Sequence, residues 1–340
     1  MKKTDLPEYT IATLGSHSAL QILKGAKDEG FKTLAICLKG REKPYQNFPV
    51  ADEIITIDSY QNFLKIEKKL AKTKTILIPH ASLIAYLGEA KVEKMKMKYF
   101  GNKKILNWEA DRNLERKWLT KAKLKLPKAF KNYKQIDRPV IVKFHGALGG
   151  QGYFLANSSA DFKEKIKPYR GKKFVIQEYI IGVPIYAHYF YSPLDQKLEL
   201  MGFDKRYESN VDSLGRISAR DQIALDCVDP SYLICGNIPV VIRESFLPRI
   251  FEMGERVVKS SAKLVPAGLF GPFCLEMIIT PQAEICVFEI SARIVAGTNP
   301  YTQGSPYTWL TYDQPMSTGR RIAREIKYAL KFNQLNKILH

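Results

Sequence analysis

The sequence predicts an α/β domain at the N-terminus followed by a larger α+β body. Strand-like apolar runs alternate with helical patterns over residues 1–100. Further along, apolar runs follow one another without long helices between them. Alternation indicates a parallel sheet with helices on its faces, whereas consecutive strands indicate an antiparallel sheet.

The N-terminal domain is expected to bind a ligand at one edge of its sheet. Apolar runs predict strands at residues 9–14, 33–38, 53–57 and 75–79, with helices between some of them. Small polar residues follow the first and fourth strands, including His17 and Ser82. Backbone N–H groups at a helix start, with hydroxyls and an imidazole, form a natural anion site. The alternative is that His17 is only a helix cap or a solvent-facing residue.

The remaining elements are read from the same patterns. We expect a helix at 108–121 capped by Asp111 and strand-like runs between 174 and 204. The last expected elements are a helix at 247–263, a hairpin at 273–290 and a helix at 319–332.

Composition limits the possible partners. The 340 residues carry a formal charge of +19, but the charge is spread out and no nucleic-acid motif accompanies it. We therefore expect no nucleic acid partner; a lysine-rich solvated surface and steering of polyanionic substrates both remain open. No apolar run is long enough to span a membrane and no secretory signal opens the sequence, which favours a cytoplasmic protein. The five scattered cysteines are expected to be buried, reduced thiols.

A glycine-rich loop lies between two predicted strands, 140–144 and 153–156, with Lys143 just before it. Glycines let a backbone approach phosphates closely and offer N–H donors. A Walker A loop is excluded because no Gly-Lys-Ser/Thr opens a following helix, and a Rossmann fingerprint is excluded because strands flank the loop on both sides. The loop is therefore either a phosphate-covering hairpin or an ordinary hairpin with a Gly-rich turn. Its glycines are Gly146, Gly149, Gly150 and Gly152.

Two acids occupy matched positions in the late hairpin. Glu276 and Glu289 lie in apolar runs on either side of the turn 281–284, and their midpoint coincides with its centre. Symmetric pairing would place their Cβ atoms roughly 5 Å apart on one face. Two such carboxylates suit Mg²⁺ or Mn²⁺ shared with phosphate oxygens. The alternative is that the register differs and each acid pairs with an Arg or Lys, for which Arg293 is near in sequence.

These landmarks together resemble a known family. Lys143 with its loop, residues 177–179, Glu276, and 289–293 resemble the ATP-grasp fold. Along almost its whole length the chain is similar to the archaeal formate-dependent 5-formaminoimidazole-4-carboxamide ribonucleotide (FAICAR) synthetases of purine biosynthesis. The stretches that carry this resemblance are 11–20 (IATLGSHSAL), 99–102 (YFGN), 204–210 (DKRYESN), 236–239 (GNIP), 271–276 (GPFCLE), 291–293 (SAR) and 297–299 (GTN).

The resemblance implies an organisation and an activity. Residues 1–100 would form a Rossmann-like domain, 101–182 the small lid subdomain of an ATP-grasp fold, and 183–340 its large subdomain with the metal site. The family joins formate to the 5-amino group of aminoimidazole carboxamide ribonucleotide (AICAR), and ATP is split to ADP and phosphate through formyl phosphate. Family members tend to be homo-oligomers, either trimers or hexamers.

The resemblance also implies a role for each candidate residue. AICAR would be held by His17, Ser82 and Asn237, and Arg293 would neutralise charge on the transferring group. Glu276 and Glu289 would bind Mg²⁺ or Mn²⁺. ATP would be held by Lys143, Gly146, Gly149, Gly150, Gly152, Gln177, Glu178, Tyr179, Ile180 and Glu208.

The chain departs from the common pattern in two places. Many ATP-grasp enzymes carry Asn two residues after the second metal-binding Glu, where this chain has Ser291, so Asn299 is a second candidate for the third ligand. Leu148 and Gln151 stand where relatives often carry basic residues. Two alternatives therefore stay open: an ATP-grasp carboxylate–amine ligase with another acid or amine, and a nucleotide-binding regulator without catalysis.

Overall fold

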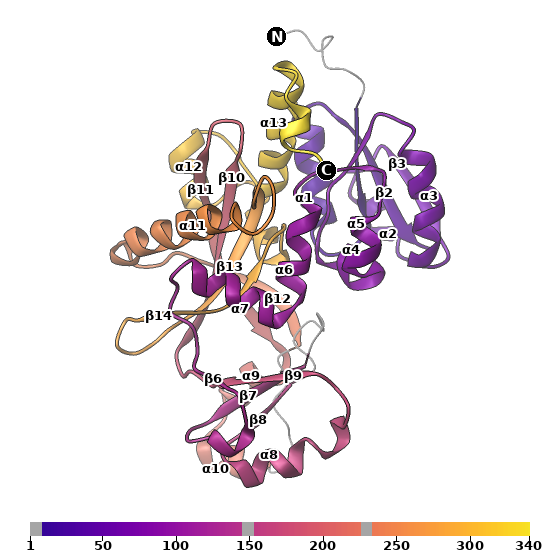
Figure 1. The fold of residues 1–340 in the computed structure, drawn as a ribbon. Coiled ribbons are helices and arrows are strands. Elements are labelled where there is room, and N and C mark those ends of the chain that lie inside the picture. The colour runs from indigo at the N-terminus through magenta and orange to yellow at the C-terminus, as the bar shows by residue number, and fades with distance from the viewer. Residues whose placement is uncertain (1–8, 145–152, 226–232) are drawn as a thin grey trace.

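The computed structural model describes residues 9–144, 153–225 and 233–340, which form three β-sheets. Figure 1 shows a parallel sheet on the right, an antiparallel sheet in the centre and a smaller sheet at the bottom. The predicted order, an α/β domain followed by an α+β body, is confirmed.

The N-terminal sheet is entirely parallel, with strand order β3-β2-β1-β4-β5. All four predicted strands are present, and a short fifth strand was not predicted. The strands are β1 (Thr10–Leu14), β2 (Lys32–Leu38), β3 (Glu53–Ile57), β4 (Thr75–Leu77) and β5 (Lys98–Tyr99).

The central sheet is antiparallel, with strand order β12-β11-β10-β13-β14. One face carries Ala187, Phe203 and Leu275 in the largest apolar core, against helices α7 (Arg112–Lys121) and α11 (Leu247–Ser261). The opposite face carries polar side chains and forms the candidate site. The strands are β10 (Val183–Ser192), β11 (Lys197–Glu208), β12 (Ile234–Val240), β13 (Gly271–Ile279) and β14 (Ile285–Ser291).

The small sheet has strand order β6-β9-β7-β8. Val140, Val142 and Ile176 pack with Phe162 of α8 (Ser159–Lys165) on one face, so Lys143, at an alternate position of β7, points to the other face. The strands are β6 (Ala129–Phe130), β7 (Val140–Phe144), β8 (Tyr153–Ala156) and β9 (Phe174–Glu178).

The helices cover these sheets, and the short 3-10 helix η6 (Ala296–Tyr301) enters the candidate site. The α-helices are α1 (Ala19–Asp28), α2 (Lys43–Asn47), α3 (Phe63–Leu70), α4 (Ala81–Leu87), α5 (Glu89–Glu93), α6 (Leu106–Ala110), α7 (Arg112–Lys121), α8 (Ser159–Lys165), α9 (Ser209–Leu214), α10 (Ala219–Ala224), α11 (Leu247–Ser261), α12 (Pro306–Tyr312) and α13 (Thr318–Lys331).

The predicted helix 108–121 is two helices that meet at Asp111. This residue has an extended backbone, and its carboxylate accepts the N–H groups of Asn113 at 2.8 Å and Leu114 at 3.0 Å. Asp111 is therefore the predicted N-cap, but of a helix that starts at Arg112 and not at Trp108. The break matters because each of the two helices supplies an acid to the site.

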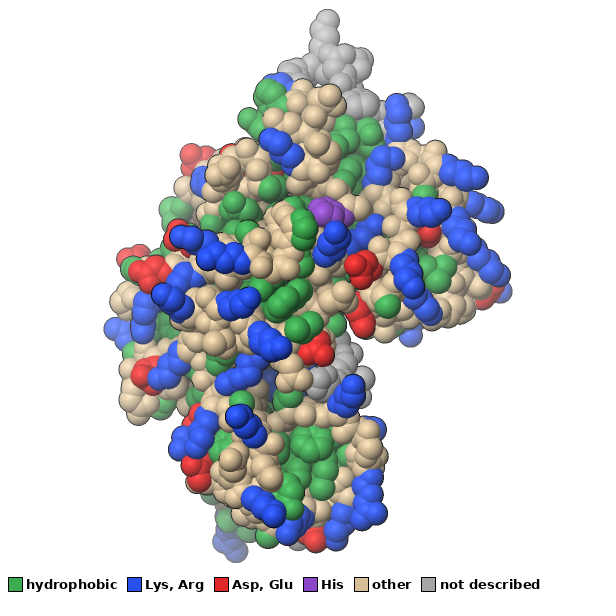
Figure 2. Space-filling view, in the orientation of Figure 1, with side chains coloured by type: hydrophobic (Ala, Val, Ile, Leu, Met, Phe, Trp, Pro, Cys, Tyr) green, Lys and Arg blue, Asp and Glu red, His purple; other side chains and the backbone are tan. Residues whose placement is uncertain are grey.

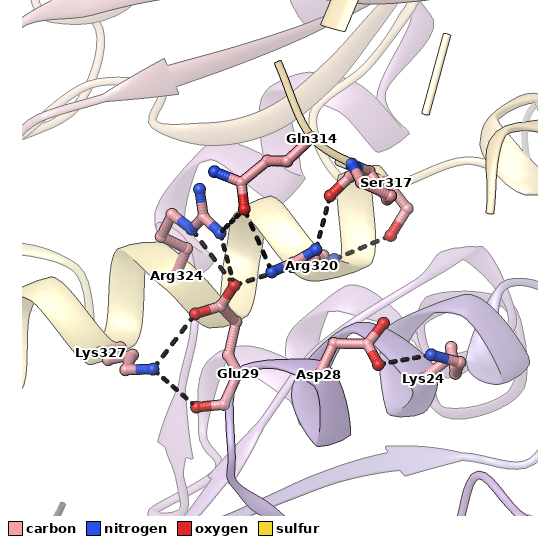
Figure 3. A network of polar contacts seen from close by, with 9 residues as sticks. Lys24, Asp28, Glu29, Gln314, Ser317, Arg320, Arg324 and Lys327 are labelled. Carbon is pink, nitrogen blue, oxygen red and sulfur yellow. Dashed lines mark hydrogen bonds and ion pairs between the residues drawn. The ribbon is translucent and has the colours of Figure 1, made fainter. Parts of the chain in front are cut away.

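Helix α13 joins the end of the chain to the N-terminal domain (Figure 1). It packs on α1 so closely that a Cβ at Gly25 would lie 2.1 Å from the backbone nitrogen of Arg320. Figure 3 shows the ion pairs that accompany this contact: the buried carboxylate of Glu29 accepts from Arg320 at 2.8 Å, Arg324 at 2.8 Å and Lys327 at 3.3 Å. Burial raises the pKa of Glu29, but the hydrogen bonds from Arg320 and Arg324 outweigh burial and lower it.

The surface agrees with the reading of a dispersed charge. Figure 2 shows Lys and Arg side chains over all parts of one face, with acidic side chains between them. Within the described part of the chain, no helix is long and apolar enough to cross a membrane.

The cysteine prediction holds for three positions and is wrong for one. Cys37, Cys274 and Cys286 are buried, free thiols. Cys235 is exposed because it lies on β12, an edge strand of the central sheet. Cys227 lies outside the described residues.

Candidate active site

The two hairpin acids lie opposite each other on neighbouring strands of the central sheet. Glu276 on β13 pairs with Glu289 on β14, which confirms the predicted pairing. The turn that produces this pairing differs from the predicted turn. Thr280 and Glu284 close a three-residue turn centred on Gln282, and Met277 pairs with Val287. Phe288 is the extra residue of a β-bulge, which shifts the register by one and brings the two acids opposite each other.

Each acid forms ion pairs. Glu276 is buried and its Oε1 accepts from Arg206 at 2.7 Å and from the Ser291 hydroxyl at 3.2 Å. Glu289 Oε2 accepts from Arg112 at 2.9 Å and lies 3.9 Å from Lys143 Nζ. The alternative is therefore right about Arg and Lys partners, although none of them is Arg293, but wrong about the register, because Glu276 pairs with Glu289.

These charges shift the ionisation of the site. Burial raises the pKa of Glu289, but Arg112 and Lys143 outweigh it and lower the pKa to about 2. Burial lowers the pKa of Lys143, although the nearby Glu289 opposes this shift. The pKa values of both groups are thus shifted by one cluster of charges, which comes from β7, β14 and helix α7.

Two acids from helices α6 and α7 hold the free edge of β14. Glu115 accepts the backbone N–H of Ile290 at 2.8 Å, and Glu109 accepts that of Ala292 at 3.0 Å. Glu109 also pairs with Arg293 at 2.9 Å. The segment that carries Glu289, Ser291 and Arg293 is therefore fixed on both sides, by β13 and by these carboxylates.

The N-terminal domain contributes two stacked imidazoles. His17 follows β1 with a φ of 56°, and its ring lies 5.2 Å from that of His80 at an interplanar angle of 6°. His80 Nδ1 accepts the backbone N–H of Ser82 at 3.2 Å, so its Nε2 donates to the Leu14 carbonyl at 2.9 Å. Burial lowers the pKa of His80 to about 4. Burial, and then the charges of His80, Arg293 and Arg206, hold the pKa of His17 well below its usual value.

Hydroxyl groups gather at the same sheet edge. The Ser82 hydroxyl lies 3.1 Å from that of Ser16, and His17 Nδ1 lies 2.7 Å from the hydroxyl of Ser18. The two predicted strand ends thus meet, as expected for parallel strands.

Helix η6 connects this edge to the central sheet. Asn299 donates to the His17 carbonyl at 3.0 Å and accepts from Gln21 at 2.8 Å. Both ends of its amide are engaged with the N-terminal domain, which removes Asn299 as a candidate third metal ligand in this arrangement. Ser291 remains beside Glu276.

One of the described residues predicted to bind ATP, Gln177, lines a cavity. A cavity of about 310 Å³ is lined by α7, β9 and Phe288, and Gln177 is part of its wall. Lys143 Nζ lies 4.8 Å above the Phe288 ring. Figure 2 shows the molecule hollowed between the N-terminal lobe and the lower lobe.

Three other predicted ATP residues, 178–180, directly follow Gln177 in the chain. Glu178 pairs with Arg138 at 3.0 Å, and the N–H of Tyr179 donates to the Pro139 carbonyl at 2.9 Å, followed by the half-buried Ile180. Glu208 ends β11, and burial raises its pKa. Gly146, Gly149, Gly150 and Gly152 lie outside the described residues, as do Leu148 and Gln151.

The donor chemistry at Glu276 and Glu289 fits a divalent cation only if other ligands complete its coordination. Among the described residues, no group of three or more His, Cys, Asp or Glu side chains is arranged to hold a metal ion. Two carboxylates and the Ser291 hydroxyl leave coordination positions for phosphate oxygens and water, as Mg²⁺ sites for nucleotides normally do.

Family models and curated relatives cover almost the whole chain. Residues 11–130 match a "Protein of unknown function (DUF1246)", and 158–340 match a "Domain of unknown function (DUF1297)". The chain is 57% identical to the 5-formaminoimidazole-4-carboxamide-1-(beta)-D-ribofuranosyl 5'-monophosphate synthetase of Pyrococcus horikoshii, over 97% of this chain and 99% of the relative. It is 48% identical to the synthetase of the same name from Methanocaldococcus jannaschii, over 99% and 96%.

Solved structures show the same fold. An IMP biosynthesis protein PurP from Thermococcus kodakaraensis superposes with a TM-score of 0.79 at 30% identity, covering 97% of this chain and 100% of that one. The ADP complex of an N5-carboxyaminoimidazole ribonucleotide synthetase matches with a TM-score of 0.69 at 17% identity, covering 96% and 79%. The fold is therefore that of the ATP-grasp enzymes.

Proposed function

The chain belongs to the family of 5-formaminoimidazole-4-carboxamide ribonucleotide synthetases, and on this premise we propose that it formylates AICAR to FAICAR with ATP and formate. It is a ligase that forms a carbon–nitrogen bond in the IMP branch of purine biosynthesis. The observation that carries the proposal is identity of 45–57% along nearly the full chain to relatives that share one name.

The reaction has two balanced steps. A formate oxygen attacks the γ-phosphorus of ATP, ADP leaves and formyl phosphate forms. The 5-amino nitrogen of AICAR then attacks the formyl carbon, phosphate leaves, and the nitrogen loses a proton. Because the leaving group is good, the protein contributes mainly positioning and charge neutralisation.

AICAR is assigned to the edge where the N-terminal domain meets the central sheet. His17, Ser82 and Asn237 are its proposed contacts. The neutral imidazoles of His17 and His80 support hydrogen bonding without a fixed charge. The connection through η6 supports this placement, because it links the His17 loop to the sheet that carries Asn237.

ATP is assigned to the cleft between the small and central sheets. Gln177, Glu178, Tyr179 and Ile180 would line the adenine site, and Glu208 would lie near the ribose. Lys143 and the four loop glycines would contact phosphates, with residues 101–182 acting as the lid. The cavity beside Gln177 and the partly buried ammonium of Lys143, 3.9 Å from Glu289, support this assignment.

Glu276 and Glu289 would hold Mg²⁺ or Mn²⁺, which when bound neutralises charge on the β- and γ-phosphates. Before ATP arrives, Arg206, Arg112 and Lys143 balance the two acids. Arg293, held by Glu109, would neutralise charge on the transferring group.

The decisive experiment measures ADP release by the full chain with AICAR, formate, ATP and Mg²⁺ present or omitted one at a time. We expect release that requires all four, with FAICAR as the product by mass spectrometry. Release with another acid but not with formate would support a different carboxylate–amine ligase. ATP binding without any turnover would support a nucleotide-binding regulator. We further propose a cytoplasmic homo-oligomer, a trimer or hexamer, which light scattering would check.

A further inference from the structure

A fully buried carboxylate lies behind one of the proposed AICAR contacts. Asp204 on β11 has no exposed surface. Its Oδ1 lies 2.8 Å from Nε2 of His188, and its Oδ2 accepts from Nδ2 of Asn237 at 2.7 Å. The three side chains come from three neighbouring strands, β10, β11 and β12, on the polar face of the central sheet.

The chemistry of Asp204 fixes how Asn237 is turned. An ionised carboxylate only accepts hydrogen bonds, so the amide of Asn237 must present its NH₂ group to Asp204. The flipped amide would set its oxygen against a carboxylate oxygen inside the protein, where an unpaired polar contact costs most. The carbonyl oxygen of Asn237 is therefore directed away from Asp204 as a fixed acceptor.

His188 holds the other side of the same carboxylate. It is buried, and its Nδ1 has no hydrogen-bond partner among the residues that the structure describes. Nε2 lies within hydrogen-bond distance of Asp204 Oδ1, an acceptor, and therefore carries the proton toward it. Asp204 is thus held by one donor on each oxygen and cannot rotate without losing one of them.

Helix η6 closes over this pair. A Cβ at Gly297 would lie 2.2 Å from Asp204 Oδ1 and 2.8 Å from His188 Cε1, so only glycine allows this close approach. Two residues later, Asn299 holds the carbonyl of His17. One short helix, η6, therefore contacts both the Asp204–His188 pair and His17, the proposed nucleotide contact.

We propose that Asp204, clamped by His188, is a positioning residue that orients Asn237 so that its carbonyl oxygen accepts an N–H of the aminoimidazole carboxamide. The inference rests on the proposed function, because it takes AICAR as the ligand of Asn237. AICAR offers N–H donors on both its 5-amino and its carboxamide groups, and a fixed acceptor selects such a base over one that presents only oxygen acceptors.

The test replaces Asp204 with an isosteric amide in the full chain. In Asp204→Asn the new side chain can donate to or accept from Asn237, so the amide loses its fixed direction. We expect the Kd and KM for AICAR to rise about tenfold or more, whereas the KM values for ATP and formate stay within about twofold. Titration calorimetry with AICAR alone, and initial rates, measure these quantities. A merely structural role would instead lower the midpoint of thermal unfolding and affect all three substrates.

Two further variants make the result specific. The double variant Asp204→Asn, Asn237→Asp exchanges amide and carboxylate, which again leaves a fixed acceptor at position 237, so AICAR affinity should recover in part. His188→Gln keeps a donor toward Asp204 and should bind AICAR better than His188→Leu. These comparisons stand even if Asp204→Asn fails to fold.

The outcomes separate the two proposals. Wild-type protein that does not bind AICAR would overturn the proposed function. Wild-type protein that binds AICAR, with affinity unchanged in Asp204→Asn and equal in the two His188 variants, would overturn the positioning role alone.

Discussion

Glu115 on α7 accepts the backbone N–H of Ile290 on β14 at 2.8 Å, across a sequence separation of 175 residues. Together with Glu109 and Ala292, this contact gives an edge strand the hydrogen bonds that a sixth strand would otherwise supply. The strand that carries Glu289 is therefore positioned by side chains from two helices as well as by its hairpin partner.

The first prediction concerns Glu115 as an acceptor. Glu115→Gln keeps an oxygen for the Ile290 N–H, whereas Glu115→Leu leaves that buried N–H unpaired. We expect Glu115→Leu to lower the free energy of unfolding by about 1–3 kcal/mol and to reduce turnover, with a much smaller effect for Glu115→Gln. Urea denaturation at neutral pH measures both.

The pH dependence of the same variants follows from the raised pKa of Glu115. Burial, and then the charge of Glu289, raise this pKa well above its usual value. A raised carboxyl pKa stabilises the fold at low pH, and that contribution is lost as pH rises from the unfolded pKa through the folded one. Glu115→Gln should therefore gain stability relative to wild type as pH rises above about 4.5. A difference that stays constant from pH 4 to 8 would contradict this.

The second prediction concerns the metal acids. Glu289→Gln should reduce ADP release by about 100-fold or more, because a neutral amide binds a divalent cation poorly. The matched control is Glu284→Gln, on the same hairpin, where an exposed pair with Lys125 is removed. Circular dichroism should show both variants folded. Turnover of Glu289→Gln within threefold of wild type would remove the metal assignment.

The third prediction concerns the stacked histidines. A His whose folded pKa is lowered stabilises the fold above its unfolded pKa, and this contribution is lost as pH falls toward the folded pKa. Because the folded pKa of His80 is about 4, its protonation in the unfolded state should lower the free energy of unfolding by about 2 kcal/mol between pH 7 and pH 5. His80→Gln should flatten the fall in unfolding free energy over this window. An equal slope in the variant and in wild type would mean that His80 is not buried neutral.

The fourth prediction concerns the attachment of α13. Glu29→Gln should lower the unfolding free energy by about 2 kcal/mol at pH 7, whereas Asp28→Asn, which removes the neighbouring exposed pair with Lys24, should cost less than about 0.5 kcal/mol (Figure 3). Because the folded pKa of Glu29 is lowered, its contribution is present above about pH 4.5 and is lost as pH falls below that value. Equal losses of unfolding free energy in both variants would show that the Glu29 ion pairs stabilise the fold no more than an exposed pair does.

Much of the fold could be predicted because the local signals are strong. Strands β3, β7 and β8 have the expected limits, and Asp111 caps the helix that it was expected to cap. The opposed acids were also predicted, although the turn is centred on Gln282 and the bulge at Phe288 corrects the register. A bulge depends on contacts across strands, and an apolar pattern does not reveal it.

The partners of the acids could not be predicted. Arg112 reaches Glu289 from a separation of 177 residues, and Arg206 reaches Glu276 from 70. Neither shows a local pattern, because an arginine in a helix or strand usually lies in solvent. One signal for Arg206 was available: it lies in 204–210, one of the stretches that resembles the family, and so does Asp204.

The contacts that α13 and the residues after it make with the N-terminal domain have a consequence for synthesis. The backbone of His340 exchanges hydrogen bonds with Tyr99 at 2.9 and 3.1 Å, and so extends the edge of the parallel sheet beyond β5. Likewise, the cations that pair with Glu29 in the described part of the chain, Arg320, Arg324 and Lys327, all lie on α13. The ribosome synthesises the first sheet long before these residues. The N-terminal domain therefore emerges without the hydrogen bonds of His340 at the sheet edge and without the cations that pair with Glu29. It can complete these contacts only after both other sheets have been translated.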